Sequence, residues 1–228
     1  MQSQKILGIV AASICLLLAG TAQAQVQITE VAPWSSGNSP ILHDWFELTN
    51  TGAASVDITG WRMNDDTVDF ASGAPMVGIT AIGAGESVIF IENGDPAAFK
   101  TLWFGAPDVP ASLQIGTYTM SGVGLSTSAD AVRVFDSGGA QQAIVTFGSS
   151  PGLPGPFPTF DNAAGVNGAI TLQSAVGVNG AFLAAGDSNE IGSPGTTVSV
   201  PEPGSALLLV LGAGALATAV QRRLRAWT

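Results

Sequence analysis

Cysteine and histidine are almost absent from this sequence of 228 residues. Its one cysteine, Cys15, lies in an N-terminal segment that we expect to be removed, so the mature chain has no disulfide, zinc–thiolate site or cysteine nucleophile. Its one histidine, His43, would have to serve any Ser-His-Asp or histidine–metal site, and no nucleophile elbow or HExxH pattern is present. We therefore predict that the protein is not an enzyme and keep a hydrolytic enzyme as a remote alternative.

Basic residues are also scarce. Between residues 25 and 196 only Arg62, Lys100 and Arg133 oppose sixteen Asp and Glu side chains, which gives a formal balance of −13. Because phosphate binding depends on clustered Lys and Arg, this charge excludes nucleic acid as a partner. An acidic surface is compatible with solubility outside the cell and with divalent cations.

Long stretches with apolar residues at helical spacing are missing from the same region, whereas alternating patterns bounded by turn residues are frequent. We predict a β-sandwich. One short helix is expected over 96–103, with Asp95 as its N-cap and Pro96 at its first position. Hairpins are expected to join 44–50 to 56–61, and 131–135 to 143–147. The predicted strands are 26–31, 44–50, 56–61, 87–91, 131–135 and 143–147.

The first 24 residues have the three parts of a secretory signal peptide. Lys5 precedes an apolar run, and the segment closes with an Ala-x-Ala pattern that ends at Ala24. We predict cleavage between Ala24 and Gln25, with the export machinery and signal peptidase as partners.

The last 32 residues are predicted to anchor and sort the protein. A linker over 197–204 precedes an apolar transmembrane helix over 205–221 and a basic tail over 222–228, and the arginines of that tail place it in the cytoplasm. The basic cluster consists of Arg222, Arg223 and Arg225.

The linker contains Pro201, Glu202 and Pro203, and the order of this motif, an apolar helix and a basic end resembles the PEP-CTERM sorting signal. That resemblance implies an exosortase as partner, with the three motif residues as its recognition site. It also implies a Gram-negative bacterium that makes exopolysaccharide.

Residues 25–196 are predicted to form one domain, which is similar to the lamin-tail domain. This resemblance implies an immunoglobulin-like β-sandwich. Two segments, 103–124 and 148–168, are longer than a minimal domain of this type needs, and we expect loops there. The matching segments are 28–31, 44–52, 56–61, 85–90, 132–136 and 191–195.

Two sets of residues in the domain are candidate binding sites. Asp65, Asp66 and Asp69 are weak candidates for calcium, because their spacing lacks the pattern of a calcium loop, so we expect no cofactor and keep calcium as the alternative. Trp34 and Trp103 lie near predicted loops, where exposed rings would stack on sugars, as in a carbohydrate-binding module.

Taken together, these features predict a non-catalytic interaction domain on an exported surface or matrix protein. We expect an intermediate anchored in the inner membrane with its domain outside the cytoplasm, followed by release to the cell surface or extracellular matrix. Exopolysaccharide or other surface proteins are the expected partners there.

Overall fold

The computed structural model describes residues 26–34, 43–65 and 67–196. Strands are the main regular structure of the described chain, which has a single helix, α2 (Pro96–Phe104), so the predicted all-β class is confirmed. The described strands are β1 (Val26–Ala32), β2 (Trp45–Asn50), β3 (Val56–Asp57), β4 (Arg62–Asn64), β5 (Ala74–Val77), β6 (Ala81–Ile82), β7 (Ser87–Glu92), β8 (Gln114–Tyr118), β9 (Asp130–Phe135), β10 (Gln141–Phe147), β11 (Phe157–Pro158), β12 (Phe160–Asp161), β13 (Gly168–Ile170), β14 (Phe182–Leu183) and β15 (Glu190–Gly192).

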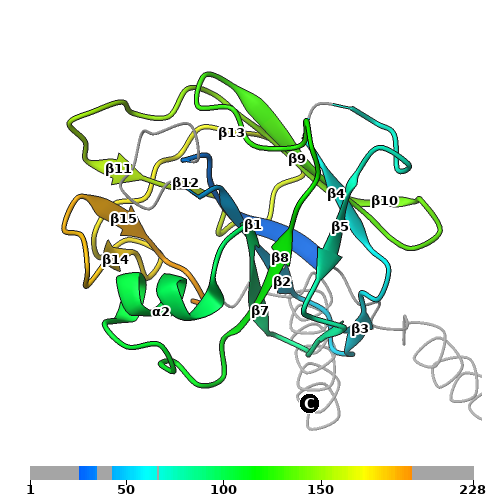
Figure 1. The fold of residues 1–228 in the computed structure, drawn as a ribbon, viewed down its shortest axis with the longest axis horizontal. Coiled ribbons are helices and arrows are strands. Elements are labelled where there is room, and N and C mark those ends of the chain that lie inside the picture. The colour runs from blue at the N-terminus through cyan, green and yellow to red at the C-terminus, as the bar shows by residue number, and fades with distance from the viewer. Residues whose placement is uncertain (1–25, 35–42, 66, 197–228) are drawn as a thin grey trace, which may run out of the picture.

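Ten strands form one continuous sheet in the order β12-β1-β2-β7-β8-β5-β4-β9-β10-β13. The sheet folds back on itself, so that β1 contacts β10 across the interior, and β5 links the two halves (Figure 1). The arrangement is consistent with the predicted immunoglobulin-like sandwich. Strands β14, β15 and β11 form a separate small sheet beside α2.

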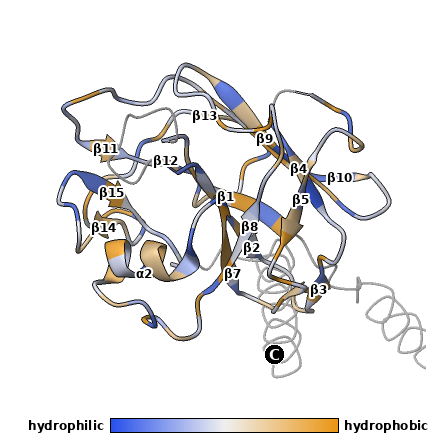
Figure 2. Cartoon of the chain, in the orientation of Figure 1, coloured by the Kyte–Doolittle hydropathy of each residue, from blue (hydrophilic) through white to orange (hydrophobic). Residues whose placement is uncertain are grey.

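The central strands β2 and β7 are buried on both faces. Phe46 of β2 stacks on Phe90 of β7 with ring centroids 5.7 Å apart, inside the core between the two halves of the sheet. The alternate residues Trp45 and Ile89 point the other way, into a second core that contains Phe99 of α2. Figure 2 shows the apolar character of β7 and of parts of α2 in orange. Two cores on opposite faces of one sheet explain how a disulfide-free domain buries so much apolar surface.

Several local predictions are confirmed. Helix α2 begins with Pro96 at its first turn, and the Asp95 carboxylate accepts a hydrogen bond from the Ala97 amide at 2.9 Å. Strands β9 and β10 pair antiparallel, as expected from the turn residues between them.

The predicted hairpin between residues 44–50 and 56–61 is wrong. Strand β2 pairs with β1 on one side and with β7 on the other, so neither of its edges is free for β3. Strand β3 contains only Val56 and Asp57 and pairs instead with β6. The turn at 50–55 therefore connects neighbouring segments that do not pair.

The segment 103–124, predicted as a loop, contains the central strand β8. It runs parallel to β7, and helix α2 is the crossover that a parallel connection requires. Gly116 lies in close contact with its neighbours, because a Cβ there would be 2.5 Å from the Val77 carbonyl oxygen and 2.6 Å from the Phe90 ring. A glycine in mid-strand weakens the pattern by which strands are recognised, which explains why this strand was missed.

The segment 148–168, also predicted as a loop, includes the short strands β11 and β12 and the first residue of β13. Strand β12 pairs with β1, and β13, which begins at Gly168, pairs parallel to β10, so this part of the chain adds both edges of the ten-stranded sheet. In the described ranges no helix is long and apolar enough to cross a membrane. The predicted signal peptide over 1–24 and the expected segments from 197 to 228 lie outside those ranges.

Candidate functional site

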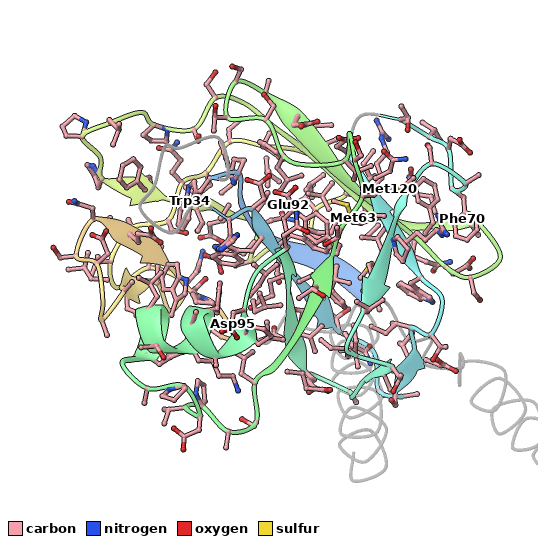
Figure 3. The ribbon with its side chains drawn as sticks, viewed as in Figure 1. Trp34, Met63, Phe70, Glu92, Asp95 and Met120 are labelled. Carbon is pink, nitrogen blue, oxygen red and sulfur yellow. The ribbon has the colours of Figure 1, made fainter. Side chains whose placement is uncertain are left out.

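The two tryptophans proposed as sugar platforms are buried. Trp34 is 0% exposed and Trp103 is 1% exposed, and their rings stack on each other with centroids 6.3 Å apart. Trp45 packs edge-on against Trp103 at 5.7 Å. Figure 3 shows Trp34 surrounded by other side chains in the interior. The prediction that Trp34 and Trp103 present exposed ring faces is wrong, because α2 folds its apolar side onto the second core.

Of the three calcium candidates, the two that the structure describes, Asp65 and Asp69, accept hydrogen bonds from different parts of the chain. Asp69 accepts a hydrogen bond from the Ala71 amide at 3.0 Å, which is a local turn contact. Asp65 accepts one from the Gly124 amide at 3.2 Å. Asp66 lies outside the described residues. Across the described ranges, no group of three or more His, Cys, Asp or Glu side chains is arranged to hold a metal ion.

The residues predicted for processing also lie outside the described ranges. They are Ala24, Gln25, Pro201, Glu202, Pro203, Arg222, Arg223 and Arg225. The described chain ends at Thr196, five residues before Pro201.

Sequence reasoning missed a pair of buried carboxylates. Glu30 of β1 and Glu47 of β2 stand opposite each other in the strand register and are 1% and 2% exposed. They lie on the sheet face that also carries Trp45, away from the core that contains Phe46. Their signal in the sequence was that Glu47 shares a strand face with a tryptophan, which marks that face as buried.

Each carboxylate of the pair accepts hydrogen bonds from hydroxyl and amide groups. Glu30 Oε1 accepts from Thr159 Oγ1 at 2.5 Å and from the Ser193 amide at 2.8 Å, and Oε2 accepts from Ser193 Oγ at 3.2 Å. Glu47 Oε1 accepts from Thr29 Oγ1 at 2.5 Å, and Oε2 accepts from the Gly195 amide at 2.7 Å. Two of these donors are backbone amides of the segment that ends the described chain.

Burial disfavours the charged form of both side chains. Burial, with the charge of Glu47 as a second cause, raises the pKa of Glu30 from 4.5 to about 8. Burial also raises the pKa of Glu47 from 4.5 to about 7, against the opposing effect of its hydrogen-bond donors. No basic side chain is among the interactions that shift either pKa.

The C-terminal segment covers this pair directly. A Cβ at Gly192 would lie 2.7 Å from Glu30 Oε1, 2.9 Å from the Trp103 ring and 3.0 Å from the Thr159 methyl group. Gly195 has φ +76°, a conformation that favours glycine, and its amide points to Glu47. We name residues 192–196 the C-terminal strap.

The all-β fold with its sandwich core defines the structural class of the domain. Residues 19–149 match the family model of the Lamin Tail Domain, so the chain belongs to the lamin-tail domain family. This immunoglobulin-like domain is a non-catalytic fold. Residues 199–223 match the PEP-CTERM protein-sorting motif, which marks an exported protein that an exosortase processes. No curated protein matches the chain.

The family match ends at residue 149, before the strands that add both sheet edges and before the strap. Residues 150–196 are nevertheless integrated with the rest of the domain, through β12 on β1 and β13 on β10. The strap and its hydrogen bonds to Glu30 and Glu47 lie outside the residues that the family model matches, so the expected resemblance over 191–195 stays a prediction.

Proposed function

We propose that the protein is an exported surface or extracellular-matrix protein, sorted by an exosortase, whose lamin-tail domain is a non-catalytic interaction module associated with exopolysaccharide. The observation that carries this proposal is the position of the sorting motif. The folded domain is described up to Thr196, and the motif match begins three residues later at residue 199. The motif therefore follows the domain closely, with little chain between them.

The non-catalytic role is supported by the placement of the acidic side chains. Glu30 and Glu47 are the carboxylates whose pKa values would suit proton transfer, but they lie beneath the strap, and their hydrogen bonds go to the protein itself. The pocket lined by Asp161, Asn162 and Asn179 has a volume of about 220 Å³, below the usual range of small-molecule sites.

The route to the surface follows from the ends of the chain. The signal peptide over 1–24 starts export, and the apolar segment 205–221 with its following arginines holds the intermediate in the inner membrane. Cleavage near Pro203 then releases the domain from that anchor. Exopolysaccharide is the proposed destination because the sorting system is associated with bacteria that make it.

The test is intact mass and cell fractionation of the full chain in a host with an exosortase and in a matched host without it. We expect loss of the tail near Pro203 only in the first host. Replacing Pro201 and Pro203 together by alanine should abolish that loss, whereas Pro107→Ala, in an exposed loop of the domain, should leave it unchanged. An intact tail in both hosts would contradict the sorting role.

Association with exopolysaccharide needs a separate measurement. The processed domain should sediment with the polysaccharide fraction of the first host and should leave it when polysaccharide synthesis is blocked. Equal recovery in the medium with and without polysaccharide would contradict this part of the proposal while leaving the sorting intact.

A further inference from the structure

The strap is held to the sandwich through the two buried carboxylates. Its backbone amides at Ser193 and Gly195 donate to Glu30 and Glu47, one amide to each side chain. We propose that Glu30 and Glu47 form a proton-dependent clasp, which holds the C-terminal strap on the domain when the pair is protonated and releases it when both are ionised.

The physical basis is the position of Glu30 opposite Glu47 on adjacent strands. Two negative charges there can be solvated by water only if the strap moves away. In the closed state the carboxylates are buried and depend on side-chain hydrogen bonds from the hydroxyls of Thr29, Thr49, Ser87, Thr159 and Ser193 and on the two strap amides. These donors do not balance two desolvated negative charges that face each other. Opening of the strap exposes both side chains to water, which solvates the charges and weakens their repulsion.

Two further acidic residues lie on neighbouring strands, and none of the interactions described for Glu30 or Glu47 comes from a basic side chain. Asp161 of β12 stands opposite Glu30 in the register and accepts hydrogen bonds from Ala163 and Asn179. Glu190, fully buried on β15, is the carboxylate that precedes the strap. The lysine of α2, Lys100, donates to the Pro110 carbonyl oxygen instead of to the pair.

The direction of the pH effect follows from proton linkage. The closed state retains protons up to about pH 7 to 8, whereas solvated carboxylates lose theirs near pH 4.5, so opening releases protons in that interval. Release of one proton per opening makes the opening equilibrium constant rise about tenfold per pH unit. The strap is therefore closed in mildly acidic medium and opens more readily as the medium becomes neutral.

The consequence for sorting rests on the proposed function. Release of residues 192–196 would lengthen the link between the domain and the motif by five residues, or roughly 17 Å of extended chain. That increase moves the bulky domain away from the membrane surface, where the processing enzyme has to reach Pro203. The clasp itself does not depend on any processing.

Hydrogen exchange of the full chain, purified in detergent from a host without exosortase, tests the clasp alone. We expect the protection factors of the Ser193 and Gly195 amides to fall at least about tenfold between pH 5.5 and pH 7.5, since opening releases protons in this range. The amides of β9 and β10 should stay more protected at every pH, because the opening is local. Constant protection of the strap, or a parallel loss in β9 and β10, would overturn the proposal.

The double variant Glu30→Gln, Glu47→Gln is the decisive comparison, because it preserves the shape of both side chains and removes both charges. Its strap protection should vary less than about twofold over the same range, whereas Asp108→Asn, in an exposed loop, should retain the wild-type dependence. If strap protection in the double variant depends on pH as strongly as in the wild type, the clasp is overturned. If the double variant does not fold, the pH dependence of strap protection in the wild type still tests the clasp.

Processing of the same chains in the exosortase host separates the two proposals. If both proposals are correct, raising the pH from 5.5 to 7.5 should speed cleavage of the wild type more than it speeds cleavage of the double variant. A pH-dependent strap in a chain that is never cleaved would contradict the proposed function alone. Cleavage without a pH-dependent strap would contradict the clasp alone.

Discussion

A rise in pH destabilises a protein through a buried acid that has no basic partner, because the folded state must give up a proton that it binds tightly. The same rise stabilises a protein through an acid that is salt-bridged in the folded state. Because the folded-state pKa values of Glu30 and Glu47 are raised to about 8 and about 7, the folded state binds more protons than the unfolded state between pH 4.5 and pH 8. The two groups therefore oppose folding least below pH 4.5, and stability decreases as the pH rises through this interval.

Glu47→Gln should remove much of the decrease in stability between pH 4.5 and pH 8. We expect its free energy of unfolding to exceed that of the wild type by roughly 1–3 kcal/mol at pH 8, and the difference to shrink toward pH 4.5. Urea unfolding at a series of pH values measures this. The control is Asp108→Asn, in an exposed loop, which should follow the wild-type curve. A Glu47→Gln variant less stable than the wild type at pH 8 would show that ionised Glu47 supports the fold.

Trp103 is a core residue, and its removal should act on stability. Trp103→Ala should lower the free energy of unfolding by about 3–5 kcal/mol, because it leaves a cavity beside Trp34 and Trp45. Leu153→Ala, at a side chain that is 74% exposed, should change it by less than about 0.5 kcal/mol. Similar effects of both substitutions in denaturant titrations would contradict the buried position of Trp103.

At the scale of secondary-structure elements, the start of α2 depends on its cap. Asp95, labelled in Figure 3 at the beginning of the helix, satisfies the amide of Ala97. Asp95→Ala should lower the free energy of unfolding by about 1 kcal/mol. Asp108→Ala removes the same charge from an exposed loop just after the helix and should be nearly neutral. Equal thermal stability of the two variants would show that the cap contributes nothing.

The parallel pair of β7 and β8 depends on the close approach at Gly116. Gly116→Ala should destabilise the domain by about 1–3 kcal/mol or more, because the added methyl group would overlap the Val77 carbonyl and the Phe90 ring. Gly148→Ala places the same group where no atom lies within 4 Å and is the matched control. A stable Gly116→Ala variant would mean that β8 can move away from β5 at little cost.

At the scale of the whole molecule, the described part of the domain is built around two apolar cores on opposite faces of one sheet. We propose that it functions without a cofactor. Addition of about 5 mM calcium, which exceeds the roughly 0.1–1 mM dissociation constants of extracellular modules, or of EDTA should leave the melting temperature unchanged. A rise in melting temperature with calcium that Asp65→Asn abolishes would instead support the calcium alternative at the acidic loop.

Much of the fold could be predicted from local patterns. The β9–β10 hairpin depends on turn residues between two alternating segments, and α2 depends on Asp95 followed by Pro96, so both signals lie within a few residues. The pairing of β2 could not be predicted in this way. Its partners β1 and β7 were decided by which strands bury its two faces, and β8 joined them only through a helical crossover.

The sequence by itself determined the sorting motif and the all-β class, because these depend on composition or on short contiguous patterns. Only the tertiary structure decided that Trp34 and Trp103 are core residues and that Glu30 and Glu47 face each other under the strap. Burial is the sum of contacts from segments far apart in the chain, here residues 30, 47, 159 and 193–195. The pKa of a carboxylate follows that burial, so it too is a property of the folded molecule.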